Sequence, residues 1–185
     1  MPELNLTNVA LVIGVIAIVG RLPLLVAPAL ARRGIAAFPR HVLTGRLLAL
    51  IAMAWGTYEL FQMPMGFLDA WKPVLWGLAP VSYVLIIFFL DELLPVRALG
   101  GLLLLAPTPM LDAARWHPSP WRFVIIALAF AWVIWGMVLV VTPFRLRQAA
   151  AFWIATDGRC RLAGLLGVLV GAFLIALALT VYRGG

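Results

Sequence analysis

Residues 121–141 read WRFVIIALAFAWVIWGMVLVV, a run of 21 residues in which Arg122 is the only charged side chain. The hydrocarbon core of a bilayer is about 30 Å thick, and an α-helix of roughly 20 apolar residues is needed to cross it. This run therefore predicts a transmembrane helix. The composition extends that prediction to the rest of the chain, because 65% of the 185 residues are hydrophobic and 11% are charged. In globular proteins, by contrast, about a quarter of the residues are charged.

Five further apolar segments follow the same pattern, at residues 6–26, 45–62, 73–90, 98–111 and 163–182. None of the six shows the period-two alternation of a membrane strand, so helices rather than a barrel satisfy the backbone. The fourth segment is short even when counted as residues 96–111, and Pro107 and Pro109 interrupt it, which predicts a thin or broken span. We therefore expect an all-α, polytopic membrane helix bundle of about six spans, forming one domain over residues 1–185.

The basic residues of the chain are distributed unequally between the predicted connections. Nine of them, counting Arg97, fall on one side of the six-span arrangement, whereas Lys72, Arg115, Arg122 and Arg183 fall on the other. Because basic residues are enriched in cytoplasmic connections, both termini are expected outside the cytoplasm. The two Arg-rich connections hold eight arginines that are expected to contact lipid headgroups: Arg32, Arg33, Arg40, Arg46, Arg145, Arg147, Arg159 and Arg161.

An internal repeat relates the two ends of the sequence. Residues 11–56 align with residues 126–171 at a constant offset of 115, and nine of the 46 positions are identical. The matches include Pro28 with Pro143 and Arg32 with Arg147. We expect two copies, at residues 6–62 and 121–182, on either side of a central hairpin at residues 73–111. An even number of crossings separates them, which makes the repeat parallel.

The second copy carries TPFR at residues 142–145, RCRLAG at residues 159–164, and then Gly167 and Gly171. This arrangement resembles the two-helix YjeT-like proteins of bacterial inner membranes, over about a third of the chain. The first copy resembles them less, because Ala49 and Ala52 replace the first two glycines. The resemblance implies a bacterial inner-membrane location and a helical architecture, but no chemistry.

Small and aromatic residues predict where helices pack. Gly164, Gly167 and Gly171 share one face of the last helix, and the latter two form a small-xxx-small pair. We expect this face to pack against the fifth span or against another chain. Trp132 and Trp135 lie three residues apart, too deep in the fifth span to belong to an interfacial belt, and need a packing partner.

Charged residues inside or beside the spans are candidates for an ion path. Arg21 lies within the first span, where it either snorkels towards headgroups or pairs with Asp91 or Glu92. Those two acids and Arg97 form either a buried ionic cluster or a solvated helix end. Glu59 shares a polar stripe with Trp55 and Gln62, and its position favours an interfacial carboxylate over proton or cation handling.

The remaining polar residues give little support to catalysis. Asp112 and His117 are the only candidates for an acid and base pair or a metal site, with no third ligand nearby. Cys160 is the only cysteine, so a disulfide within the chain and a multi-cysteine metal site are excluded. His41 and His117 both lie in predicted connections, which disfavours transmembrane haem and histidine-ligated chlorophyll. We expect no cofactor and no metal.

The leading hypothesis is a non-catalytic membrane protein that acts as an accessory subunit or scaffold. Its expected partners are membrane lipid and other integral membrane proteins or a second copy of itself, and not nucleic acid, because no basic stripe alternates with exposed aromatics. A small transporter or channel that uses the intramembrane charges is the alternative. A membrane enzyme that uses Asp112 and His117 ranks third, so the expectation is that the chain is not an enzyme.

Overall fold

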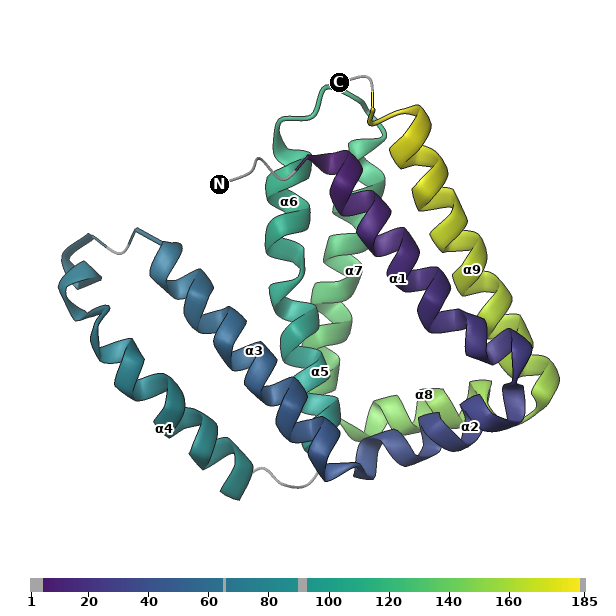
Figure 1. The fold of residues 1–185 in the computed structure, drawn as a ribbon, viewed down its shortest axis with the longest axis horizontal. Helices are drawn as coiled ribbons and strands as arrows, with labels where there is room; N and C mark the ends of the chain where they lie inside the picture. Colours follow the sequence, from purple (N-terminus) through teal and green to yellow (C-terminus); the bar gives the residue numbers. More distant parts are fainter. Residues whose placement is uncertain (1–4, 65, 90–92, 184–185) are drawn as a thin grey trace. The chain divides into compact units, whose positions relative to one another are not determined.

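The computed structural model describes residues 5–64, 66–89 and 93–183, and throughout these ranges the secondary structure is helical with no strand (Figure 1). The all-α prediction is therefore confirmed for this part of the chain. The α-helices in chain order are α1 (Leu6–Val26), α2 (Pro28–Ala37), α3 (Val42–Gln62), α4 (Val74–Phe89), α5 (Leu94–Leu105), α6 (Pro107–Arg115), α7 (Arg122–Val141), α8 (Phe144–Trp153) and α9 (Asp157–Thr180). Short 3-10 helices, η1 (Phe38–Arg40) and η2 (Gly66–Trp71), precede α3 and α4 respectively.

Each of the six predicted apolar segments is helical over most of its described residues, and most of the differences lie at the helix ends. The first segment coincides with α1, whereas α9 begins earlier than predicted. The reason is an N-cap, because Thr156 accepts a hydrogen bond at Oγ1 from the backbone N–H of Arg159, at 3.3 Å. Arg159 and Arg161 therefore lie in the first turns of α9 rather than in a connection. In the same way His41 caps α3 by accepting at Nδ1 from the backbone N–H of Thr44, at 3.2 Å.

The fourth segment is longer than predicted. Helices α5 and α6 follow one another directly, and Leu94–Arg115 forms a candidate span of 22 residues. The predicted break is present at Ala106, and Pro107 stands at the start of α6. Proline is tolerated there because the first N–H groups of a helix have no intrahelical acceptor.

Within the described ranges, four helical segments are long and apolar enough to cross a bilayer: α1, Leu94–Arg115, α7 and α9. The bent pair of α2 and α3 gives a fifth if it counts as one span. Helix α4 has 16 residues, which corresponds to about 24 Å of rise and falls short of a typical hydrocarbon core. The described part of the chain thus has four or five helical segments that could span a membrane by length and composition.

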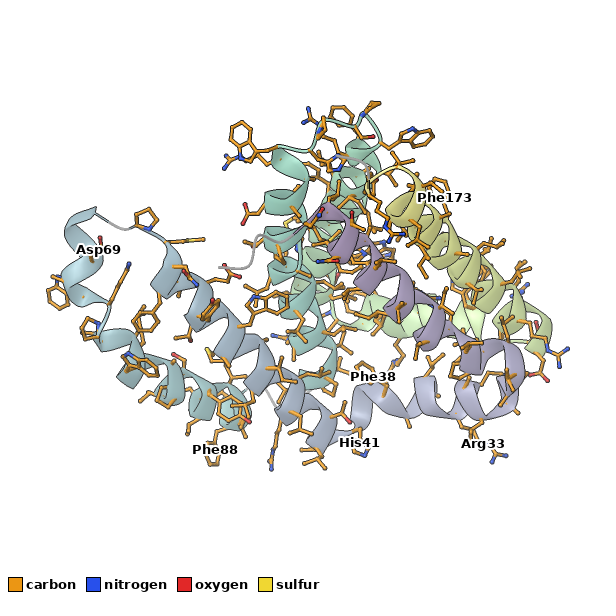
Figure 2. The ribbon with its side chains drawn as sticks, turned by 45° about the horizontal axis from the view of Figure 1, so that its top comes forward. Arg33, Phe38, His41, Asp69, Phe88 and Phe173 are labelled. Carbon is orange, nitrogen blue, oxygen red and sulfur yellow. The ribbon has the colours of Figure 1, made fainter. Side chains whose placement is uncertain are left out.

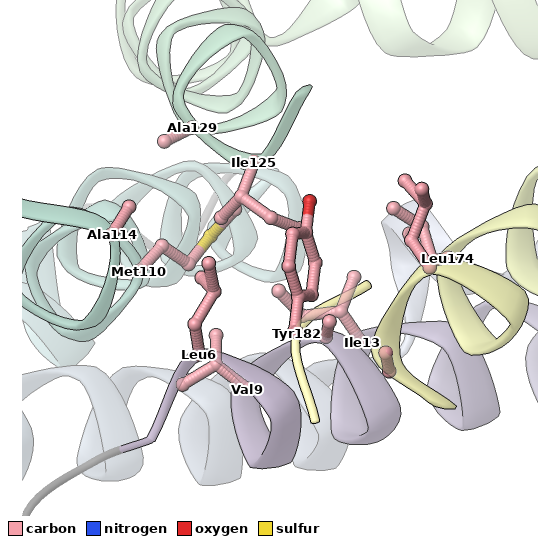
Figure 3. Packing of buried hydrophobic residues seen from close by; sticks show 12 residues of the cluster. Leu6, Val9, Ile13, Met110, Ala114, Ile125, Ala129, Leu174 and Tyr182 are labelled. Carbon is pink, nitrogen blue, oxygen red and sulfur yellow. The ribbon is translucent and has the colours of Figure 1, made fainter. Parts of the chain in front are cut away.

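The chain folds into two compact units, each built from segments that are distant in sequence. Unit 1 comprises Met1–Ala36, Ala106–Ile134 and Arg147–Gly185. Its core lies where one end of α1 meets α6, α7 and the end of α9 (Figure 3). The buried side chains of this core are Leu6, Val9, Ala10, Ile13, Met110, Ala114, Ile125, Ala129, Leu174, Leu177, Ala178 and Tyr182.

Unit 2 comprises Ala37–Leu105 and Trp135–Leu146. Its small core joins α3 to α5 through Ala49, Leu94 and Ala98, with Tyr83 and Ile86 of α4 packed against them. The Tyr83 hydroxyl also donates a hydrogen bond to the carbonyl oxygen of Arg46, at 3.1 Å. Small residues dominate this core, so the backbones of α3 and α5 approach closely.

Candidate functional site

Helices α1 and α9 run antiparallel along each other in unit 1 (Figure 1). At one end, which we call the terminal end, Thr7 donates a hydrogen bond from Oγ1 to the carbonyl oxygen of Tyr182, at 2.9 Å. At the other, the arginine end, Arg32 forms an ion pair with Asp157, at 2.7 Å between Nη1 and Oδ1. Arg32 also donates to the carbonyl oxygen of Ala155, at 3.1 Å. Both ends of the helix pair are therefore fixed by polar contacts.

The two helices touch through their backbones at Gly14 and Gly171. A Cβ atom built on Gly14 would lie 2.9 Å from the carbonyl oxygen of Gly171, and one built on Gly171 would lie 2.8 Å from the carbonyl oxygen of Gly14. Each contact is well inside the 3.4 Å at which ordinary van der Waals contact begins. The reciprocal arrangement is that of Cα–H···O contacts at close helix pairs. No residue with a side chain fits at either position without a shift of the backbone.

The other two glycines of the predicted face also contact α1. A Cβ atom on Gly164 would lie 3.0 Å from Leu24 Cβ. One on Gly167 would lie 2.5 Å from Arg21 Cγ and 3.0 Å from its Cδ. The glycine face of α9 thus packs against the first span, whereas the sequence analysis expected the fifth. Gly14 explains the difference, because a residue without a side chain at this position of α1 lets the backbone of Gly171 approach closely.

A second glycine contact of the same kind occurs in unit 2, between α5 and α7. A Cβ atom on Gly100 would lie 2.9 Å from the carbonyl oxygen of Gly136, and one on Gly136 would lie 2.9 Å from that of Gly100. Nearby, a Cβ on Gly45 of α3 would meet the ring of Pro95 at 2.9 Å. The sequence analysis did not single out Gly14, Gly100 or Gly136. The sequence signal that could have identified them is a single glycine inside an apolar span, because it lets a neighbouring backbone approach closely.

A hydrogen-bonded cap closes the terminal end of unit 1. The Tyr182 hydroxyl donates to the carbonyl oxygen of Trp121, at 2.7 Å, and burial raises the pKa of this phenol above its ordinary value. His117, 8% exposed, stacks edge-on against Tyr182 and accepts at Nδ1 from the backbone N–H of Ser119, at 3.2 Å. That bond leaves Nε2 as the protonated nitrogen, 3.4 Å from the Tyr182 carbonyl oxygen. Arg122 donates to the His117 carbonyl oxygen, at 2.9 Å.

This cap bears directly on the predicted pair of Asp112 and His117. Both ring nitrogens of His117 face backbone groups, and the Asp112 side chain is exposed on α6. Among the described residues, no group of three or more His, Cys, Asp and Glu side chains is placed to hold a metal. His117 therefore has a structural role, because it joins the connection that precedes α7, in which it lies, to Tyr182 after the end of α9.

Among the described residues, no two of the predicted intramembrane charges form an ion pair with each other. Glu59 accepts a hydrogen bond at Oε1 from the Trp55 indole, at 2.9 Å, and both side chains are half-buried on α3. Asp91 and Glu92 lie outside the described residues. Arg97 has a buried Nε without a hydrogen-bond partner among the residues that the structure describes. Arg21 is exposed, with its stem against Gly167.

The two deep tryptophans differ in their surroundings. Trp132 is half-buried and packs against the core of unit 1, whereas Trp135, in unit 2, is 51% exposed. The predicted packing partner is therefore present within the chain for Trp132. Trp135 presents about half of its surface to whatever surrounds the helix.

The arginines predicted to contact headgroups are mostly exposed. Arg32 is half-buried in its ion pair, Arg33 of α2 is exposed (Figure 2), and the side chain of Arg40 lies outside the part described. Two of the others lie over aromatic rings, with Arg145 5.9 Å from the Phe144 centroid and Arg159 4.7 Å from that of Phe152. The remaining exposed members of the set are Arg46, Arg147 and Arg161.

Comparison of the chain with protein-family models, curated proteins and solved structures finds no match. The resemblance to the YjeT-like proteins therefore stays a prediction.

Proposed function

We propose that the chain is a non-catalytic integral membrane protein, a subunit or scaffold that packs against other integral membrane proteins or a second copy of itself. The observation that carries this proposal is the large aromatic and aliphatic surface left open on unit 2. Helix α4 has no buried residue, and Phe88 and Phe89 at its end are 78% and 81% exposed (Figure 2). Lipid can cover aliphatic side chains, but large rigid aromatics such as Trp135 gain more from a shaped protein surface.

The α1–α9 pair supports a scaffold role in a second way. Its glycine contacts and its polar contacts at both ends leave little freedom for one helix to slide along the other. Transport by alternating access needs elements that rock or slide against each other. A rigid pair suits a protein that presents a fixed surface.

We also propose the six-span topology, with α3 and α4 as the second and third crossings. The antiparallel course of α1 and α9 supports an even number of crossings, since it brings the start of α1 and the end of α9 to the same end of unit 1. The Arg-rich connections favour a cytoplasmic location for the opposite end, and hence termini outside. The parallel repeat gains support from the order of a long, a short and a long helix in α1 to α3 and again in α7 to α9. A bacterial inner membrane rests on the YjeT-like resemblance alone.

The experiment that tests the subunit proposal is photo-crosslinking in native membranes. A photoreactive residue replaces Phe88 or Trp135, and a matched control replaces Met110, which is 2% exposed in the core of unit 1. We expect a discrete adduct with one integral membrane protein or a second copy from the exposed positions, and none from position 110. Chains that stay free of protein adducts at both exposed positions, and that run as monomers in mild detergent, would contradict the proposal.

A small transporter or channel is the second candidate, and Glu59 favours it. This carboxylate is half-buried on a mostly apolar helix and is bonded to the Trp55 indole. Intramembrane carboxylates commonly serve as proton or cation sites. Proton or cation flux into vesicles that is abolished by Glu59→Gln would support this candidate, whereas unchanged flux across a panel of ions would remove it.

A further inference from the structure

Arg21 is the only charged residue of α1, and among the described residues of unit 1 it forms no ion pair with an acidic side chain. The described part of this unit holds two acidic residues, Asp112 and Asp157. Asp157 is bound to Arg32 at the arginine end. Asp112 is on α6, which packs beside the start of α1 at the terminal end. The described acidic side chains of unit 1 therefore leave the exposed Arg21 guanidinium available to an anionic group outside the chain.

Gly167 determines where the Arg21 side chain runs. The stem crosses the bare backbone of α9, because a Cβ on Gly167 would lie 2.5 Å from Arg21 Cγ, 3.0 Å from Cδ and 3.2 Å from Nε. The missing side chain at position 167 thus opens a groove for the arginine. An arginine held along a groove loses less freedom when it binds a ligand than one that moves freely in solvent.

The position of Arg21 along α1 decides which anion it meets. Arg21 lies five residues before Val26, the last residue of the helix, which corresponds to about 7.5 Å of rise along the helix axis. An arginine at that depth reaches the phosphate layer by snorkelling. Exposed arginines on the same side of unit 1, Arg33 on α2 and Arg159 and Arg161 at the start of α9, add positive charge there. Such a field concentrates anionic lipid.

We propose that Arg21, seated over Gly167, binds the phosphate of an anionic phospholipid in the leaflet at the arginine end of the α1–α9 pair. The planar guanidinium presents two parallel N–H donors to phosphate, which an ammonium does not. The lipid phosphate supplies the negative charge that pairs with the Arg21 guanidinium, and the lipid lies against the helix pair. The inference deepens the proposed function, since it names the lipid partner of the scaffold, and it rests on α1 crossing the bilayer.

The test is lipid binding by the purified full chain, measured by native mass spectrometry in mild detergent with added phosphatidylglycerol. We expect Arg21→Leu to weaken binding by at least about ten-fold, because it removes both charge-assisted hydrogen bonds to the phosphate. Gly167→Ala should weaken it in the same direction, because the added methyl group pushes the stem out of its groove. The matched controls are Arg183→Leu, which removes an equal charge from an exposed site at the terminal end, and Gly20→Ala, whose added methyl meets no atom within 4 Å. Both should bind as the unaltered chain does.

Three further arms separate the sources of phosphate and the competing explanations. Phosphatidylcholine should bind more weakly than phosphatidylglycerol, and inorganic phosphate should not displace the bound lipid. Equal losses in Arg21→Leu and Arg183→Leu would overturn the proposal, because they would indicate general charge attraction. Release of a co-purifying membrane protein by Arg21→Leu, with lipid binding unchanged, would also overturn it in favour of a protein carboxylate. Neither result touches the crosslinking test at Phe88 and Trp135, so the two proposals fail separately.

Discussion

Replacement of Gly171 by alanine is expected to destabilise the α1–α9 pair, although alanine is the better helix former. The new methyl group would lie 2.7 Å from Ile18 Cγ1 and 2.8 Å from the backbone oxygen of Gly14. A side chain can rotate away, but the carbonyl oxygen belongs to the helix, so α1 and α9 must move apart. Overpacking of this kind costs about 1–3 kcal/mol. Alanine recovers up to about 1 kcal/mol of helix propensity, which leaves a net loss of up to about 2 kcal/mol when that gain is complete.

The assay is reversible unfolding of the purified chain in mixed micelles, with the fraction of sodium dodecyl sulfate raised stepwise and helix content followed by circular dichroism. Gly20→Ala is the matched control, because the same change in α1 adds a methyl group to open space and is expected to leave stability unchanged or slightly raised. The double variant Gly14→Ala with Gly171→Ala should lose less than the sum of the two single losses, since either methyl alone separates the helices. Equal stability of Gly171→Ala and Gly20→Ala would refute the proposed backbone contact.

Three other expectations use the same unfolding assay. Tyr182→Phe removes the hydrogen bond to the Trp121 carbonyl oxygen and should cost about 0.5–1.5 kcal/mol of unfolding free energy. Because burial raises the pKa of this phenol, its contribution to stability is complete below the ordinary pKa of 10.0 and is lost as the pH rises above that value. The Tyr182→Phe variant should not show this loss. Arg32→Ala should cost less than about 1 kcal/mol despite the 2.7 Å ion pair, because both side chains are partly exposed, and a loss of several kcal/mol would contradict this. Gly100→Ala should destabilise unit 2, because an overpacking cost of about 1–3 kcal/mol outweighs a gain of up to about 1 kcal/mol in helix propensity, and a stabilised variant would rule out the glycine contact between α5 and α7.

The positions of the membrane-length helices were predictable from the sequence because charged residues or prolines mark the ends of the apolar runs. The bounds of α1 match residue for residue, and α7 differs by one residue at its start. Helix starts were harder to place where a polar residue caps a helix that begins among arginines. Thr156 extends α9 through Arg159 and Arg161 in this way, against the simple rule that arginines mark connections.

The packing partners were not predictable in the same way. The sequence predicted one packing face for the α9 glycines, but a face does not specify its partner. Only the three-dimensional arrangement pairs Gly171 with Gly14 and seats Arg21 over Gly167. The polar role of His117 also depends on contacts far apart in sequence, because its partner is the carbonyl oxygen of Tyr182. One sequence carries little information on such distant pairs, whereas helix periodicity is local.

The central claim is that α1 and α9 form an antiparallel pair that crosses the bilayer with its arginine end on one side. Gly34 of α2 and Gly158 of α9 both lie near that end, and a side chain at either position meets no atom within 4 Å. Single cysteines at these two positions, in a chain whose buried Cys160 is replaced by alanine, are labelled with a membrane-impermeant maleimide in intact cells and in lysed cells. The claim predicts the same labelling pattern for both cysteines. With the arginine end in the cytoplasm, both are protected in intact cells and labelled in lysed cells. Labelling of one from outside and the other only after lysis would contradict it.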